Sequence, residues 1–336
     1  MTDNIEEKTL TDAPQTEVSA EQVVATEVSE QEGAQDTEQT AAEKAVMKEK
    51  DIEKTEKRQK AMRITVNVFI YVFLTVMAVI VIFPFYWMIM SSFKSYEEYY
   101  AGFVPTFWPT QGFDVKNFLE AFEMGNLGTL FINTLYVGLV STVLSLIITV
   151  LSAFAFARLE FKGKNILFAG LLATMMIPGE LFTITNFKTV ADLGWKNTYV
   201  VLILPFLVSV FYIYLLRQNF MQIPNELYYA AKVDGTSDLK YLWKVMIPLA
   251  MPTLITITIL KMMGSWNSYV WPNLVNTSDV YYLVTVGIRK MDFSQAQPDI
   301  PVQMAAVTLV SIPLFLVFIF LRKYIMRGVS RSGIKG

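Results

Sequence analysis

The sequence predicts a polytopic membrane protein with six transmembrane spans. Three observations favour this class: 53% of the 336 residues are hydrophobic, the mean hydropathy is positive, and long uncharged apolar runs recur through most of the chain. Runs of about 20 apolar residues match the thickness of the hydrocarbon core of a bilayer. The pattern therefore indicates helices in a membrane rather than the buried core of a soluble protein.

The first 63 residues differ from the rest, because they hold 16 of the 30 acidic residues. Residues 1–47 contain 12 acids, 2 lysines and no aromatic residue. Such a segment has too little apolar surface to offset the entropy of ordering, so we expect an acidic disordered tail; a docking arm is the alternative. The tail lacks the apolar core of a signal peptide. Residues 48–63 carry seven basic and four acidic residues, and predict a short basic juxtamembrane helix.

Residues 64–336 form the predicted transmembrane domain. It contains six apolar runs separated by polar loops, and the segment 217–247 between the fourth and fifth runs is the most polar helix-forming stretch among them. The predicted spans are approximately 64–90, 130–156, 166–184, 199–216, 248–270 and 302–321.

Basic residues in the loops predict the orientation of these spans. The loop after the second span has three basic residues, the segment 217–247 has four and the C-terminal tail has five, whereas each intervening loop has two. Lysine and arginine are retained on the cytoplasmic side of membranes. We therefore expect a multi-pass protein of the cell membrane (plasma or inner membrane) with both termini and the segment 217–247 in the cytoplasm.

Several function classes are excluded by what the sequence lacks. It contains no cysteine and no histidine, which excludes thiol catalysis, histidine-based triads and histidine metal sites. No phosphate-binding glycine motif is present, and no basic stripe interleaved with aromatic residues indicates nucleic-acid binding. We therefore predict no catalytic residue, no metal site and no cofactor bound by this chain. If transport requires ATP, a separate subunit must hydrolyse it.

Between Tyr228 and Pro248 the periodicity predicts two short amphipathic helices joined at Gly235. Glycine accepts the left-handed conformation that ends a helix, and Thr236 or Ser237 can cap the next one. One face of the first helix presents Leu227, Ala230, Ala231 and Asp234, and the apolar stripe of the second presents Leu239, Leu242, Trp243 and Met246. From periodicity alone, a linker lying on the membrane surface is also consistent with this pattern.

The spacing of this segment resembles a known motif. Ala230-Ala231, three residues, Gly235, nine residues and then Val-x-Ile-Pro resemble the "EAA" loop of permease subunits in binding-protein-dependent ABC importers. The usual glutamate of that loop is replaced by Tyr229, and the nearest acid is Glu226. Three further stretches resemble motifs of the same family, in the same order: Leu193-Gly194-Trp195-Lys196-Asn197-Thr198, Ser265–Pro272 and the ending from Gly328 to Gly336.

The resemblance covers about residues 64–336. Within the family, the sequence resembles the smaller membrane subunit of maltose-type carbohydrate permeases. It implies an all-α ABC importer type I permease fold, with a second homologous permease subunit, two ATPase subunits, an extracytoplasmic solute-binding protein and membrane lipid as partners. The implied substrate is a carbohydrate, such as an oligosaccharide. The implied ATPase-coupling residues are Glu226, Leu227, Ala230, Ala231, Asp234, Gly235 and Leu239, and the implied tail contacts with the ATPase are Gly333, Lys335 and Gly336.

A few polar and aromatic residues in the spans are candidates for a translocation pathway. Lys261 lies in the fifth span, where a charge is costly, so it is predicted to face the pathway, to pair with Glu180 or to lie at the outer interface. Trp266, Asn267 and Tyr269 offer stacking faces and an amide to a sugar, and an aromatic belt at the interface explains them equally well.

Three alternatives to a carbohydrate importer are consistent with a multi-span chain. A permease for a non-sugar solute is disfavoured, because the resemblance to the Trp266-Asn267 segment and to the Lys335-Gly336 ending belongs to the carbohydrate type. An ion-coupled secondary transporter needs intramembrane carboxylates and internal repeats, and only Glu180 qualifies. A membrane enzyme lacks its histidine, cysteine or paired aspartates.

Overall fold

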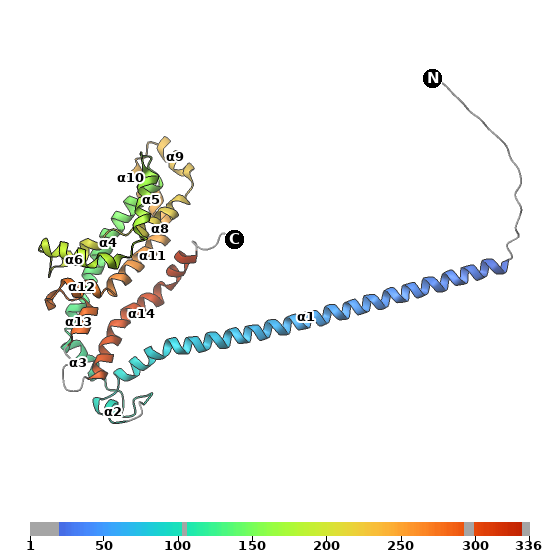
Figure 1. Ribbon diagram of the computed structural model, residues 1–336, viewed down its shortest axis with the longest axis horizontal. Helices are drawn as coiled ribbons and strands as arrows, with labels where there is room; N and C mark the ends of the chain where they lie inside the picture. The colour runs from blue at the N-terminus through green and yellow to red at the C-terminus, as the bar shows by residue number, and fades with distance from the viewer. Residues whose placement is uncertain (1–19, 103–105, 292–298, 331–336) are drawn as a thin grey trace, which may run out of the picture. The chain divides into compact units, whose positions relative to one another are not determined.

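The computed structural model describes residues 20–102, 106–291 and 299–330. Every regular element within these ranges is a helix (Figure 1). The chain divides into two compact units, Met1–Ile82 and Phe83–Gly336. In chain order the elements are α1 (Ala20–Ser92), α2 (Tyr96–Tyr100), α3 (Lys116–Met124), α4 (Leu127–Ala157), α5 (Lys164–Thr174), η1 (Gly179–Phe182), α6 (Thr183–Asp192), α7 (Tyr199–Ile203), η2 (Leu204–Phe206), α8 (Val210–Met221), α9 (Asn225–Val233), α10 (Asp238–Tyr241), η3 (Leu242–Met246), α11 (Ile247–Trp266), α12 (Val270–Val275), η4 (Asp279–Tyr281), α13 (Val284–Lys290) and α14 (Ile300–Ser330).

The first unit consists of the greater part of α1. This helix begins at Ala20, so residues 20–47 are helical where the sequence predicts disorder. Alanine, glutamate and glutamine dominate this stretch, and all three favour helices without help from a core. The helix continues through residues 48–63. Residues 1–19 of the acidic tail lie outside the described residues.

Four helices of the described residues are long and apolar enough to cross a membrane: Lys57–Ser92, Leu127–Ala157, Asp238–Trp266 and Ile300–Arg322. The predicted spans 166–184 and 199–216 are not straight. The first corresponds to α5 followed by η1 and α6, bent by 84°, and the second to α7 and η2 followed by α8, bent by 46°. Counting each bent pair as one span gives up to six.

The two bends coincide with prolines. Pro178 follows a non-helical turn after α5, and Pro205 lies inside η2. Proline cannot donate a backbone hydrogen bond and disfavours helical geometry in the residue before it. The hydropathy of these segments therefore gives the correct composition for a span, and Pro178 and Pro205 favour the breaks, although Pro252 and Pro313 lie inside continuous helices.

The core of the second unit lies between α4, α8 and α11. Small and apolar side chains of these helices are buried together, including Ala153 and Phe154 of α4, Leu216 of α8 and Ala250 of α11. Buried Ser141 and Thr149 also lie on α4. Small side chains allow transmembrane helices to approach closely, and this close packing is a main source of their association.

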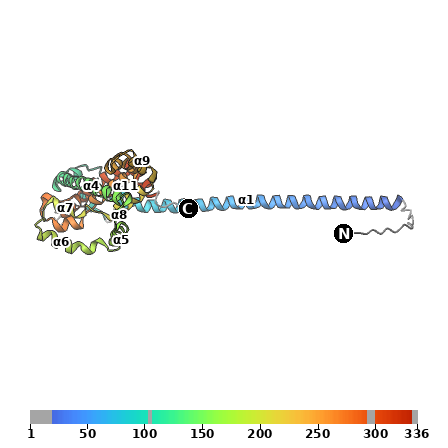
Figure 2. The same ribbon diagram turned by 90° about the horizontal axis from the view of Figure 1, so that it is seen from above.

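The opposite ends of this bundle carry different elements. In Figure 1, α9 and α10 lie at one end, whereas α2 and α3 lie at the other. Figure 2 shows α5 and α6 along one side of the bundle. The only fully buried residues of these two helices are Phe168 and Val190, respectively, and apolar side chains such as Ile166, Leu167 and Ile184 are exposed.

Candidate functional sites

The segment between α8 and α11 contains the predicted pair of short helices. The first is α9, which ends in a Schellman turn: the amide of Thr236 donates to the carbonyl of Ala231 at 2.8 Å, and the amide of Gly235 donates to that of Lys232 at 3.0 Å. Gly235 has a φ of 67°, the left-handed conformation predicted for it. Ser237 occupies the N-cap position of α10, but its side chain makes no capping hydrogen bond.

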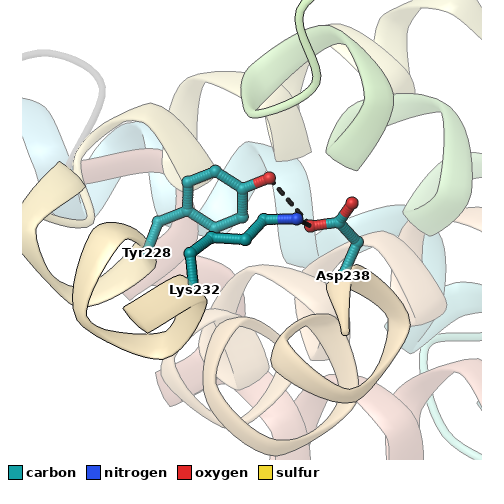
Figure 3. Close-up of polar contacts among 3 residues, drawn as sticks. All are labelled: Tyr228, Lys232 and Asp238. Carbon is teal, nitrogen blue, oxygen red and sulfur yellow. Dashed lines mark hydrogen bonds and ion pairs between the residues drawn. The ribbon is translucent and has the colours of Figure 1, made fainter. Parts of the chain in front are cut away.

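Three side chains connect the two sides of this turn (Figure 3). The Tyr228 hydroxyl donates to Asp238 Oδ1 at 2.8 Å, and Lys232 Nζ lies 2.7 Å from the same oxygen. The hydrogen bond to Asp238 raises the pKa of the Lys232 ammonium above its usual value. Burial raises the pKa of the Tyr228 hydroxyl, and its hydrogen bond to Asp238 acts in the same direction. These contacts link α9 to α10 across Gly235.

The second helix differs from the prediction at its end. Instead of stopping before Pro248, α10 continues through the π-helical turn η3 into α11. Pro248 lacks the amide that an α-helix would use to bond the carbonyl four residues earlier. Widening to a π-helix accommodates this change without ending the helix. α10, η3 and the fifth span therefore form one continuous rod from Asp238 to Trp266.

The predicted apolar stripe of α10 divides into two faces. Leu242 and Met246 are buried in the core with Tyr241, whereas Leu239 and Trp243 are exposed. The π-helical turn changes the register, so residues spaced for one face of an α-helix lie on different sides. The two exposed side chains of this stripe are available to a partner.

Most residues implied for ATPase coupling are exposed. Ala231 is the exception, because it is half-buried and packs against the core cluster of α4, α8 and α11. Tyr229, at the position of the expected glutamate, is 59% exposed, and Val233 is 88% exposed. The sequence prediction did not single out Val233. The exposed implied residues are Glu226, Leu227, Ala230, Asp234, Gly235 and Leu239.

Arg158 anchors the segment 217–247, whereas the sequence pattern indicates only a basic residue of the loop after the second span. It lies at the end of α4 and is 8% exposed. Its Nη2 donates to the carbonyls of Phe220 at 2.8 Å and Ile223 at 2.5 Å, and its Nη1 donates to the side chain of Asn225. Asn225 is the first residue of α9. The short loop Arg158-Leu-Glu-Phe-Lys after the second span was the only sequence signal for this role.

The Leu193–Thr198 motif forms a second Schellman turn. Gly194 has a φ of 70°, and the amide of Trp195 donates to the carbonyl of Val190 at 2.9 Å. Asn197 Oδ1 accepts from the amides of Thr277 at 2.7 Å and Ser278 at 3.0 Å. The motif therefore fastens the end of α6 to the loop after α12.

The Ser265–Pro272 segment contains one structural anchor. Trp271 is buried, and its Nε1 donates to the carbonyl of Val201 at 2.9 Å. Trp266 is also buried and packs against Phe131 with ring centroids 5.8 Å apart. Trp266 therefore belongs to a core cluster rather than to an open pathway. Asn267 and Tyr269 are exposed.

A cavity of about 380 Å³ opens beside α11. Lys261 lines it, and Lys261 Nζ donates to the carbonyl of Phe206 at 2.7 Å. Phe206 is the last residue of η2, so the lysine connects α11 to the bend before α8. Glu180 is exposed on η1 and does not line this cavity. The tail residues Gly333, Lys335 and Gly336 lie outside the described residues.

Comparison with known proteins agrees with this arrangement. Over residues 54–331 the sequence matches the family described as "Binding-protein-dependent transport system inner membrane component". It is 30% identical over 260 residues to the arabinooligosaccharides transport system permease protein AraQ of Halalkalibacterium halodurans, covering 77% of this chain and 93% of that protein. It is 29% identical over 265 residues to the diacetylchitobiose uptake system permease protein NgcG of Streptomyces coelicolor, covering 76% and 84%.

A solved structure has a similar fold. It is a crystal structure of a bacterial ABC transporter involved in the import of the acidic polysaccharide alginate. The similarity has a TM-score of 0.69 at 25% sequence identity and covers 77% of this chain and 95% of that chain. The two chains therefore share their overall fold.

Proposed function

Because the chain belongs to the family of inner membrane components of binding-protein-dependent transport systems, we propose that it translocates a carbohydrate, driven by ATP hydrolysis in separate subunits. The predicted family, all-helical permease fold and membrane location are confirmed by the family match and the similar structure. A carbohydrate as substrate is supported by the relatives, two of which are named for arabinooligosaccharides and diacetylchitobiose.

The observation that carries the coupling proposal is the exposed surface around Gly235. Leu227, Val233 and Leu239 expose apolar side chains beside the turn, although other side chains of the segment bond or pack within the chain. Exposed apolar groups on a braced element are typical of a docking surface. In this proposal the surface enters a groove of the ATPase, with both termini in the cytoplasm.

The continuous rod from Asp238 to Trp266 suggests how a movement below reaches the membrane. A rigid-body shift of a docked α10 would carry α11 with it, because the helix continues from one to the other without a break. Such a shift changes which side of the membrane the pathway faces, as in other rocking transitions. The chain itself performs no covalent chemistry and holds no cofactor in this proposal.

The remaining partners follow from the same mechanism. A second homologous permease subunit would cover the exposed apolar side of α5 and α6, with membrane lipid around the rest. A solute-binding protein outside the cell would deliver the carbohydrate. The tail residues Gly333, Lys335 and Gly336 are proposed to contact the ATPase. Two ATPase subunits, one beneath each permease chain, complete the assembly.

Substitution of Gly235 tests the coupling proposal. Gly235→Asp places a charge at the centre of the proposed docking surface, and an added Cβ meets nothing in this chain within 4 Å. We expect the permease chain to reach the membrane at normal levels but to lose ATPase binding and ATP-dependent uptake. The measurements are uptake in cells and recovery of the ATPase with the purified permease.

Gly194→Asp is the matched control. Gly194 has the same left-handed φ in the same kind of turn, with equally open space around it. Both variants therefore incur a similar backbone cost, about 1 kcal/mol. Normal uptake and ATPase recovery in Gly235→Asp would contradict the proposal, as would an equal loss in both variants.

A further inference from the structure

The cavity beside α11 is lined by one cation and several hydroxyl groups. It lies between α4, the bend from η2 to α8, α11 and α12. Its polar lining consists of Ser141, Ser209, Tyr212, Lys261, Ser265 and Ser268. No aspartate or glutamate is among the residues that line it.

The charge of Lys261 has no acidic partner in this lining. The contact found for its ammonium is the carbonyl of Phe206, which accepts at 2.7 Å. An ammonium has three donors, so this contact leaves capacity for further acceptors. A cation within a transmembrane helix is costly unless an anion or a set of dipoles compensates it.

A purely structural role explains the hydrogen bond but not the charge. The bend after η2 frees the carbonyl of Phe206 from helical bonding, and Lys261 satisfies it. A neutral donor such as glutamine would make the same hydrogen bond at a lower desolvation cost. The positive charge is therefore suited to something that is not part of this chain.

The wall of the cavity also leaves room for a ligand. Gly264 lines it on α11, and an added Cβ there would meet nothing within 4 Å. The volume of about 380 Å³ lies within the range of small-ligand sites. Hydroxyl groups around one cation suit a solute that has both hydroxyl groups and an anionic group.

We propose that this cavity is a transit site for an anionic, polyhydroxylated solute, with Lys261 pairing with its carboxylate or phosphate. The inference rests on the proposed function and narrows its substrate to an acidic sugar or a sugar phosphate. Serine hydroxyls on α4 and α11 bond the hydroxyl groups of the solute. Lys261 supplies the charge-assisted hydrogen bond, which is stronger than a neutral one.

Binding to the complete importer in lipid nanodiscs tests this inference. The probes are a galacturonate trisaccharide, glycerol 3-phosphate and neutral maltotriose, each titrated by calorimetry without the solute-binding protein. We expect at least one acidic probe to bind, and Lys261→Gln to weaken it about tenfold or more. Lys261→Arg should retain most of the affinity. Which acidic probe binds distinguishes a carboxylate from a phosphate as the recognised group.

Two further variants serve as references. Gly264→Leu fills the cavity from its open wall and should weaken the acidic probe as strongly as Lys261→Gln, although it removes no charge. Lys162→Gln removes an exposed lysine in the loop between α4 and α5 and should change nothing.

Three results would overturn the inference: no binding of either acidic probe at millimolar concentration, unchanged affinity in Lys261→Gln, or stronger binding of maltotriose than of both acidic probes. These results are independent of the coupling test. If the importer shows no preference for the acidic probes over maltotriose but takes up solute normally with ATP, only the transit site is rejected. If the importer binds an acidic probe selectively but its uptake does not depend on ATP, only the proposed function is rejected.

Discussion

The turns at Gly194 and Gly235 have the same backbone geometry but opposite surroundings. Each ends a helix in a Schellman motif with a left-handed glycine. Around Gly194, the neighbouring Asn197 is bonded to the loop after α12, so the chain itself uses the polar groups of the turn. Around Gly235, a hydrogen bond and an ion pair join α9 to α10, and the apolar side chains of Leu227, Val233 and Leu239 are exposed.

This difference shows that a motif has two separable parts. The glycine determines the backbone turn, and neighbouring residues determine whether the turn is bound within the chain or left open. The Leu193–Thr198 turn is bonded to another part of the permease, whereas the Gly235 turn exposes apolar side chains. A turn that is already formed loses little entropy when it binds a partner, which favours docking at Gly235.

The largest expected effect follows from removing the anchor of α9. Arg158→Ala leaves two backbone carbonyls and the Asn225 side chain without their buried donor. We expect a loss of about 3 kcal/mol in the free energy of unfolding, together with loss of uptake. Thermal unfolding of the purified complex measures the first effect. Lys162→Ala in the same loop is the control, and equal melting temperatures for the two variants would refute the assignment.

A smaller loss is expected at the Gly194 turn. Asn197→Ala removes the acceptor of two backbone amides and replaces an asparagine with a φ of 56°. We expect about 2 kcal/mol of destabilisation with little change in ATPase recovery. Asp192→Asn, on the exposed end of α6, serves as the control in the same unfolding assay. If Asn197→Ala lowered ATPase recovery without lowering stability, the two turns would not differ in function as proposed.

The smallest effect on stability is expected at the Gly235 brace. Tyr228→Phe removes one hydrogen bond to Asp238 and leaves the Lys232 ion pair in place. Exposed ion pairs and single surface hydrogen bonds contribute little to stability. We expect an unchanged melting temperature and fewer solute molecules transported per ATP hydrolysed, measured in proteoliposomes. A shift in melting temperature as large as that of Asn197→Ala would contradict this ranking.

Predictions from local backbone chemistry agreed with the structure better than predictions of what a side chain contacts. The left-handed Gly235 follows from local backbone chemistry, and the structure has it as predicted. Ala231 is implied for ATPase coupling and Trp266 is a candidate for a sugar contact or an aromatic belt. In the structure Ala231 packs against the core and Trp266 is buried against Phe131. Periodicity identifies the residues that share a face, but it does not tell whether that face meets the protein, lipid or a partner.

The sequence by itself determined the class of the protein, the positions of its apolar segments and the turn at Gly235, because hydropathy and backbone propensity are local properties. Tertiary structure decided the rest. The bends, the continuous rod of α10 and α11, the anchoring of α9 by Arg158 and the isolation of Lys261 in a cavity all depend on contacts between distant residues. Those contacts depend on which helices pack together. The residues around Arg158 in the sequence do not indicate that it will bond the carbonyls of Phe220 and Ile223.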